Sequence, residues 1–170
     1  MAAAEKKDAI ALLKEDHRKV EELFEQFEKA SGDGHKAKLA RQICLELIVH
    51  AEIEEKIFYP ACEGKIEEDL LKEAYVEHDG AKVLIAEIEG NDSAGDEYFD
   101  AKVKVLQEQI EHHVEEEEKR MEGMFAQARK SDLDLDALGQ QMAEMKRQLM
   151  VSHEQRLPTP ELTTLTETRI

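Results

Sequence analysis

The sequence predicts an all-α protein: an up-down-up-down four-helix bundle followed by a short fifth helix and a flexible tail. Three observations support this fold class. The 170 residues include only 8 glycines and 3 prolines, whereas a sheet protein of this length needs more turn residues. Apolar residues recur every three or four positions over long stretches, which indicates helices with one buried face. Short polar segments separate these stretches, and short connections place consecutive helices antiparallel.

The first two predicted helices are separated by a glycine-containing turn. The first covers residues 4–30, and its apolar stripe consists of Ile10, Leu13, Val20, Phe24 and Phe27. The segment SGDGH comes next, and glycine-rich segments are typical of helix ends. The second covers residues 36–63 and ends before Gly64. Its apolar stripe consists of Leu39, Ile43, Leu47 and Ile57.

The third and fourth predicted helices complete the bundle. The third covers residues 67–89, and its apolar residues are Leu71, Val83, Leu84, Ile85 and Ile88. The segment GNDSAGD then predicts a turn, and Asp96 is suited to cap the next helix. The fourth helix, residues 96–130, is predicted to be the longest. Its apolar stripe consists of Val103, Leu106, Ile110, Val114, Met121 and Phe125. Residues 1–130 are therefore expected to form the bundle domain.

The remaining residues are expected to form an additional helix and a tail. Within residues 131–155, the segment 136–153 carries an apolar stripe at helical spacing, made of Leu138, Met142, Met145 and Leu149. This helix either docks on the bundle or binds a protein partner, since methionine-rich faces suit adaptable contacts. Residues 156–170 are rich in proline and threonine. We expect them to form a flexible tail.

Charge and cysteine usage narrow the classes of partner and compartment. The formal net charge of −17 argues against nucleic acid and anionic membrane surfaces as partners. No run of 18 apolar residues is present, so no membrane span is expected. Cys44 and Cys62 would lie about 27 Å apart on one helix, too far for a disulfide. Reduced cysteines, together with an N-terminus unlike a signal peptide, lead us to expect a cytoplasmic protein.

Four of the seven histidines lie on the apolar stripe of a predicted helix. They are His17, His50, His78 and His113. The first two lie about sixteen and seventeen residues from the turn centred near residue 33, so they are at one height in an antiparallel pair. The other two match each other more loosely across the turn near residue 93. His112 falls off the stripe, and His35 and His153 are expected at the surface.

Two carboxylates join this layer and repeat with it. Glu54 and Glu117 each follow a stripe histidine by four positions, so each shares that histidine's helix face. An unpaired buried polar group costs about 1–3 kcal/mol, and a bound cation removes this penalty. Imidazole and carboxylate ligands together suit iron, manganese or zinc. Helix bundles hold di-iron and di-manganese carboxylate sites in their interiors, so this layer is predicted to bind metal.

At these residues the sequence resembles the hemerythrin-like (HHE cation-binding) family over about residues 8–128. The segments that carry the resemblance are EDHRKVEELF, HAEIEEKIFYP, EHDGAKVL and HHVEEEEKRM. The resemblance implies two iron ions (Fe²⁺/Fe³⁺) with an oxo, hydroxo or water bridge, and a function in binding or sensing O₂ or a related small oxidant, NO or peroxide. It implies that the ligands are His17, His50, Glu54, His78, His113 and Glu117. The two glutamates would bridge the ions.

The chain departs from oxygen-carrying hemerythrins at one ligand. Those proteins place a second histidine one turn from the helix-three ligand, whereas Ala74 and Lys82 stand at these positions here. Water, or an oxygen of Tyr75 or Glu21, is expected to fill the gap. The departure argues against reversible O₂ transport. Two alternatives stay open: a di-iron redox enzyme that decomposes peroxide, and an iron-handling or interaction protein whose fifth helix, residues 136–153, recruits a partner.

Overall fold

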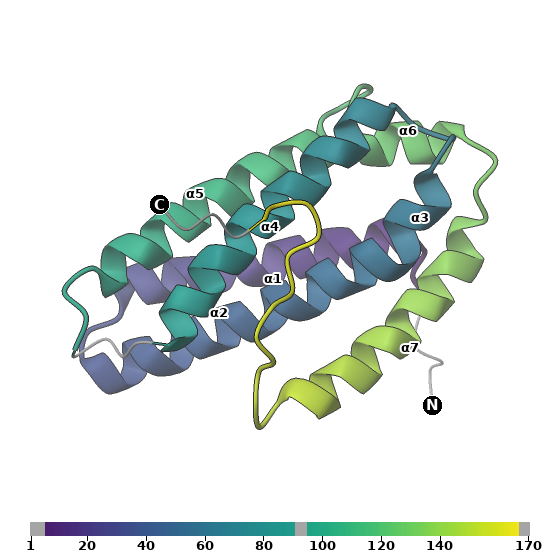
Figure 1. The fold of residues 1–170 in the computed structure, drawn as a ribbon. Coiled ribbons are helices and arrows are strands. Elements are labelled where there is room, and N and C mark those ends of the chain that lie inside the picture. Colours follow the sequence, from purple (N-terminus) through teal and green to yellow (C-terminus); the bar gives the residue numbers. More distant parts are fainter. Residues whose placement is uncertain (1–5, 91–94, 167–170) are drawn as a thin grey trace.

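The computed structural model describes residues 6–90 and 95–166, and all regular secondary structure in these ranges is helical (Figure 1). The chain runs through eight elements, among them the π-helical turn η1. They are α1 (Ala9–Lys29), α2 (Asp33–Ile53), η1 (Glu54–Phe58), α3 (Tyr59–Cys62), α4 (Glu68–Gly90), α5 (Phe99–Glu118), α6 (Met124–Lys130) and α7 (Leu135–His153). Within these described ranges, no helix is both long and apolar enough to cross a lipid bilayer.

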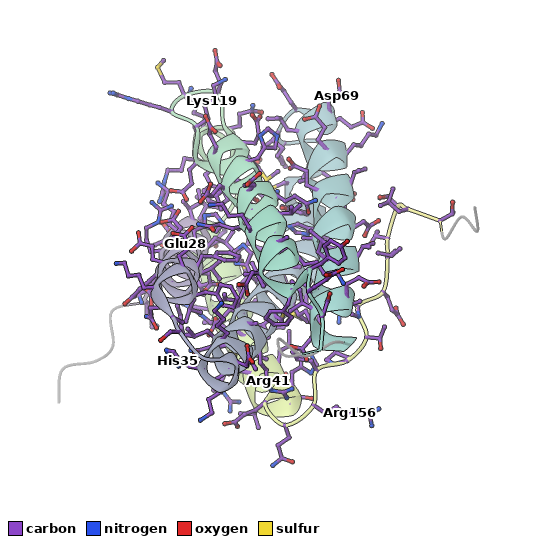
Figure 2. All side chains as sticks on the ribbon, turned by 90° about the vertical axis from the view of Figure 1, so that its left-hand side faces the viewer. Glu28, His35, Arg41, Asp69, Lys119 and Arg156 are labelled. Atoms are coloured by element: carbon purple, nitrogen blue, oxygen red, sulfur yellow. The ribbon has the colours of Figure 1, made fainter. Side chains whose placement is uncertain are left out.

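The predicted four-helix bundle is confirmed. Helix α1 packs against α2, α2 against α4 and α4 against α5, and the contact of α5 with α1 closes the bundle (Figure 1). The Asp8 carboxylate caps α1 by accepting a hydrogen bond from the backbone N–H of Ala11 at 2.8 Å. Charged and polar side chains such as His35 and Lys119 point away from the bundle (Figure 2). The first predicted helix begins later than expected, at Ala9, and residues 1–5 lie outside the described ranges.

The second predicted helix contains one turn of different geometry. Helices α2 and α3 are joined without interruption by η1, where the Tyr59 N–H donates to the carbonyl of Glu54, five residues earlier. Pro60 lies in the first turn of α3 and has no N–H to continue the α-helical pattern. One i→i+5 turn brings residues five apart onto the same face of the helix. Glu54 and Tyr59 therefore both face the interior, and both are fully buried.

The fourth predicted helix is not continuous, and this prediction was wrong. Helix α5 ends at Glu118, the chain leaves the helix over residues 119–123, and α6 begins at Met124. Met121 adopts a φ of 70°. A Cβ at Gly123 would lie 2.5 Å from the backbone oxygen of Lys119, so only glycine fits this close return of the chain. With 20 residues, α5 is also shorter than α4, which has 23.

The C-terminal part of the chain covers the bundle. Helix α7 packs across α1 and α2 and buries Met142, so it docks on its own bundle. We expected residues 156–170 to be flexible. The structure differs, because residues 156–166 run extended across α4, the yellow segment in Figure 1, where backbone N–H groups bind the buried carboxylate of Asp79. Residues 167–170 lie outside the described ranges.

The buried side chains divide into two apolar clusters with a polar layer between them. The first cluster includes Phe24, Phe27, Ile43, Ile85 and Leu106. The second lies at the α3 and α6 end of the bundle and includes Ile10, Leu13, Phe58, Met124 and Phe125. Burial of this apolar surface on both sides excludes water and holds the helices at fixed height. The polar layer is thereby kept inside a dry core.

Candidate metal centre

The six predicted ligand side chains converge in the polar layer between the two apolar clusters. They form two groups of three. The first group is His17, His50 and Glu117, and the second group is Glu54, His78 and His113. Within each group the candidate ligand atoms all lie within 4.8 Å of one another. All six side chains are buried, so neither group is an exposed acidic cluster.

The carboxylate of Glu54 lies between the two groups. Its Oε1 is 2.8 Å from Nε2 of His50 in the first group and 3.3 Å from Nε2 of His78 in the second. Burial raises the pKa of this carboxyl group, but the neighbouring histidines, His50 above all, outweigh it and hold the pKa well below its usual range. Glu54 is therefore an anion in contact with both groups.

The carboxylate of Glu117 occupies the matching place on α5. Its Oε1 lies 3.3 Å from Nε2 of His17 and 3.2 Å from Nε2 of His113. These two histidines again come from different groups. The two halves of the chain thus contribute one shared carboxylate each, and this arrangement suits two cations held a short distance apart.

Each of the four histidines also faces a second carboxylate with its other ring nitrogen. We call these four residues the outer carboxylates. The Nδ1 to oxygen distances are 2.7 Å for His17 to Glu118, 3.0 Å for His50 to Asp16, 3.5 Å for His78 to Glu55 and 2.9 Å for His113 to Glu77. A carboxylate on one ring nitrogen fixes the ring orientation and leaves the other nitrogen to bind metal. Every Nε2 is accordingly directed inward.

The outer carboxylates form a closed ring around the bundle. Each outer carboxylate is adjacent in the sequence to one of the six predicted ligands, and it contacts a histidine on a different helix. Asp16 on α1 contacts His50 on α2, and Glu118 on α5 contacts His17 on α1. The sequence analysis missed these four residues. The sequence does contain a signal for them: an acidic residue is adjacent to each of His17, Glu54, His78 and Glu117.

The carboxylates on both sides of the histidine rings change the pKa values of these rings. Burial lowers the pKa of His50, but the carboxylates of Glu54 and Asp16 outweigh it and raise the pKa to about 10. The pKa values of His17 and His113 are also raised, because their own carboxylate neighbours outweigh burial. Protons and metal ions compete for the same Nε2 atoms, so binding of a cation here releases protons.

Tyr59 is a further residue of the layer that the sequence analysis missed. Its hydroxyl donates to Oε2 of Glu117 at 2.9 Å and lies 3.2 Å and 3.4 Å from Nε2 of His78 and His113. Burial and the carboxylates of Glu117 and Glu54 raise its pKa well above the usual value. An α-helical pattern places Tyr59 off the face of Glu54, and only the π-helical turn η1 brings both inward.

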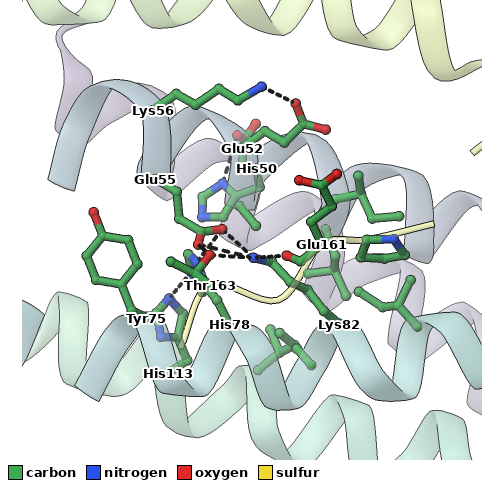
Figure 3. A pocket seen from close by; sticks show the side chains of 18 of the residues that line it. His50, Glu52, Glu55, Lys56, Tyr75, His78, Lys82, His113, Glu161 and Thr163 are labelled. Carbon is green, nitrogen blue, oxygen red and sulfur yellow. Dashed lines mark hydrogen bonds and ion pairs between the residues drawn. The ribbon is translucent and has the colours of Figure 1, made fainter. Parts of the chain in front are cut away.

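The two residues proposed for the missing histidine position lie elsewhere. The side chain of Glu21 is 42 % exposed and pairs with Arg18 on the surface. The Tyr75 ring packs edge-on against Tyr59 with the ring centroids 5.2 Å apart, and its hydroxyl points away from His78 and His113 (Figure 3). The Tyr59 hydroxyl is instead the oxygen that contacts both histidines of the second group.

The donor set fits metal ions. Within the described ranges, six buried side-chain atoms lack a hydrogen-bond partner. Five of them face inward: Nε2 of His17 and of His50, both carboxylate oxygens of Glu54, and Oε1 of Glu117; the sixth is Nδ1 of His78. Several of them lie close to one another but are not aligned for hydrogen bonds. Unpaired buried polar atoms are rare because each costs about 1–3 kcal/mol. Cations coordinated by these nitrogens and oxygens would satisfy all five.

A cavity of about 760 Å³ leads to the layer between α2, α4 and the C-terminal segment (Figure 3). His50, His78 and His113 lie on its inner wall, and Figure 3 shows Glu161 and Thr163 on the side of the C-terminal segment. Its remaining walls are largely apolar, formed among others by Val20, Leu47, Ile48, Ile85 and Val114. A small molecule can therefore approach the histidine rings through this cavity, whose wall also carries charged side chains such as Glu55 and Lys82.

Comparison with known proteins identifies the domain. The hemerythrin HHE cation-binding domain matches residues 8–125. A crystal structure of a hemerythrin HHE cation-binding domain-containing protein from Mycobacterium kansasii shares the fold, with a TM-score of 0.72 and 23 % identity over 86 % of this chain and 89 % of that chain. A DNA nickase from Nostoc sp. (strain PCC 7120) is 29 % identical over 107 residues, which are 63 % of this chain. The chain spans only 30 % of the length of that relative.

Proposed function

The chain belongs to the hemerythrin HHE cation-binding family, and from that premise we propose that it holds a non-haem di-iron centre that binds or senses O₂ or a related small oxidant, NO or peroxide. One observation carries the proposal. Two buried groups of imidazole and carboxylate donors share the two glutamates, and five of their inward atoms, on His17, His50, Glu54 and Glu117, lack hydrogen-bond partners among the described residues. Imidazole with carboxylate is a ligand set suited to iron.

Each ion would have two histidine ligands of its own, and the two glutamates would be shared by both ions. His17 and His50 would hold one ion, and His78 and His113 would hold the other, with Glu54 and Glu117 bridging the two. The Tyr59 hydroxyl supplies one more oxygen beside the second ion. Bound iron supplies a redox-active centre that a small oxidant can approach. Three outer carboxylates hydrogen-bond the Nδ1 atoms of His17, His50 and His113 and so keep Nε2 directed inward, and Glu55 lies 3.5 Å from Nδ1 of His78.

The surroundings of the layer favour a small uncharged ligand. The cavity that reaches His50, His78 and His113 has largely apolar walls. Such walls admit O₂, NO or neutral peroxide more readily than an anion, because burial of an unpaired charge is costly. The apolar clusters cover the layer above and below, so the cavity is the side from which a ligand can approach the donors. This environment suits reversible binding or sensing of a gas or peroxide.

Metal analysis combined with optical titration tests the proposal. The full chain is produced with ample iron, its iron content is measured, and its absorption spectrum is recorded before and after addition of O₂, NO or peroxide. We expect about two iron ions per chain and a spectral change with at least one oxidant. Glu115→Gln is the control, because Glu115 is exposed on α5 close to Glu117. Less than one iron per chain, or an unchanged spectrum with all three, would contradict the proposal.

A second candidate is turnover of peroxide by the same centre. The observation in its favour is the unequal donor supply of the two groups: the Tyr59 hydroxyl contacts both histidines of the second group, whereas in the first group the His17 ring stacks on Phe125, and histidines of both groups line the cavity. An incompletely ligated ion beside an open path favours turnover. An oxygen electrode distinguishes this candidate. We expect oxygen release from peroxide well above that of the same amount of free iron salt, and equal rates would eliminate it.

A further inference from the structure

The C-terminal segment beyond the family domain reaches two of the histidines of the metal layer. The family domain ends at residue 125. Helix α7 then lies against α1 and α2, and the segment of residues 158–165, which we call the strap, crosses α4 (Figure 1). Each of these two elements contacts one outer carboxylate, and each of these carboxylates contacts a histidine of a different group.

The first connection runs from α7 through Asp16 to His50. The Lys146 ammonium donates to Oδ1 of Asp16, and Oδ2 of the same carboxylate lies 3.0 Å from Nδ1 of His50. Asp16 is only 4 % exposed. The two oxygens of one buried carboxylate thus have separate partners, so the position of Lys146 influences where the carboxylate holds the imidazole. Arg147, the next residue, pairs with Glu144 on its own helix instead.

The second connection runs from the strap through Glu55 to His78. The Thr163 hydroxyl donates to Oε1 of Glu55 at 2.7 Å, and Oε2 of Glu55 lies 3.5 Å from Nδ1 of His78. Lys82 adds its ammonium 2.9 Å from Oε2 of Glu55 and donates to the strap carbonyl of Glu161 at 3.0 Å. Figure 3 shows this group on the wall of the cavity. Glu55 therefore has partners on the strap, on α4 and on the histidine ring.

The strap is itself held in place by a buried carboxylate of α4. Asp79 accepts hydrogen bonds from the backbone N–H groups of Thr163, Thr164 and Leu165 at 2.8, 2.5 and 2.8 Å, and from the Thr164 hydroxyl at 2.7 Å. These bonds outweigh burial and keep the pKa of Asp79 well below its usual range. Because three consecutive N–H groups are bound to one carboxylate, the Thr163 hydroxyl has a defined position.

The other two outer carboxylates have partners within the bundle. Glu118 pairs with Arg18 on α1, and Glu77 contacts His112 on α5. The C-terminal segment thus contacts one outer carboxylate of each ligand group, Asp16 for the first group and Glu55 for the second. Helix α7 and the strap reach these carboxylates from different helices, because α7 packs on α1 and α2 and the strap is bound to α4.

We propose that Lys146 and Thr163 are positioning residues for the metal centre, acting through Asp16 on His50 and through Glu55 on His78. This inference rests on the proposed function, since it concerns how firmly the same centre holds its ions. A partner on the outer carboxylate restricts the ring and keeps Nε2 directed at the ion. The residues after position 130 therefore form part of the metal site, and movement of the strap would change the retention of iron.

Two matched pairs of substitutions in the full chain test the inference. Thr163→Val removes the hydroxyl bound to Glu55 and keeps the size of the side chain, whereas Thr159→Val changes an exposed threonine of the same strap. Lys146→Met removes the partner of Asp16, whereas Arg147→Met removes a surface pair within α7. The measurement is the rate at which a chelator removes iron from the loaded protein, together with the melting temperature of the metal-free protein.

We expect Thr163→Val and Lys146→Met to accelerate iron loss by about threefold to tenfold. Direct loss of an outer partner costs 10–100-fold in metal affinity, and a residue one step further out acts more weakly. The control variants should stay within about twofold of wild type, and Thr163→Ser should restore the wild-type rate. Equal rates within each pair, or a lower melting temperature with unchanged iron loss, would overturn the inference. A wild-type chain that takes up no iron would instead overturn the proposed function, and this inference with it.

Discussion

The two ligand groups are built from the same kinds of residue, yet their surroundings differ. In the first group the His17 ring stacks on Phe125 with the centroids 5.7 Å apart and the rings 10° from parallel. In the second group the Tyr59 hydroxyl lies beside both histidine rings, 3.2 Å from His78 and 3.4 Å from His113. An apolar neighbour on one side and an oxygen donor on the other make the two halves of the centre unequal. Two metal ions bound in these groups would have different neighbours. Such a difference suits a centre in which one ion keeps only its protein ligands and the other binds a small molecule.

The difference originates in the residues that come after each shared glutamate. Both halves of the chain carry His-x-x-x-Glu-Glu. After Glu54 the helix continues through the π-helical turn η1, which brings Tyr59 inward. After Glu117 the helix ends one residue later, at Glu118, and the chain turns through residues 119–123. A repeated motif therefore gives equivalent ligands but different neighbours.

Removal of a shared carboxylate should have the largest effect, because it affects both groups at once. We expect Glu54→Gln to weaken iron binding by more than about 100-fold, beyond the range for loss of an outer partner. Iron content should fall from about two ions per chain to less than one. The measurement is iron analysis after gel filtration, with Glu115→Gln as the matched control. Retention of both ions in Glu54→Gln would show that the glutamate does not join the groups.

Removal of one histidine should affect its own group more than the other. We expect His17→Ala to lose the first ion and His78→Ala to lose the second, so each variant keeps about one iron per chain, because each retains one complete group of donors. Iron analysis together with the absorption spectrum of each variant distinguishes them. The two spectra should differ, because the Tyr59 hydroxyl lies beside both histidines of the second group, whereas in the first group it contacts Glu117. Identical spectra would mean that the groups are equivalent.

Tyr59→Phe tests directly whether the hydroxyl makes the groups unequal. The ring is kept, so packing is preserved, but Oε2 of Glu117 loses its donor at 2.9 Å. We expect the metal-free protein to lose about 1–3 kcal/mol in free energy of unfolding, and the iron-loaded protein to change its visible absorption. Denaturant titration and absorption spectroscopy measure these effects. Tyr75→Phe is the control on the neighbouring ring, and the same change in both variants would rule out a specific role for Tyr59.

The smallest expected effect is a change of stability with pH in the metal-free protein. The folded pKa of His50 is raised to about 10, above its unfolded value of about 6.5. The protonated ring therefore stabilises the fold fully below pH about 6.5, and this contribution is lost as the pH rises toward about 10. We expect the melting temperature of the metal-free protein to fall between pH 7 and pH 9.5, within this window. Calorimetry checks the sign, and a rising melting temperature would contradict the pairing of His50 with Asp16 and Glu54.

The sequence by itself determined the helices and the level of the histidines. Helical periodicity is a local property, so the apolar stripes predicted four helices and showed that four histidines lie on them. Equal distances from the turns then predicted that these rings share one layer. The structure brings all six predicted side chains together in that layer. Their role as ligands stays a prediction until iron is measured.

Tertiary structure alone decided the outer surroundings of the layer. The π-helical turn that brings Tyr59 inward, the break after Glu118, the ring of outer carboxylates and the strap cannot be deduced from a single helical period. Thr163 meets Asp79 across 84 residues of chain, and Lys146 meets Asp16 across 130. Such contacts depend on how packed helices place distant side chains against one another. The pattern of residues along one segment shows only which face of that helix is buried. These features depend on how several helices pack together, so the pattern does not reveal them.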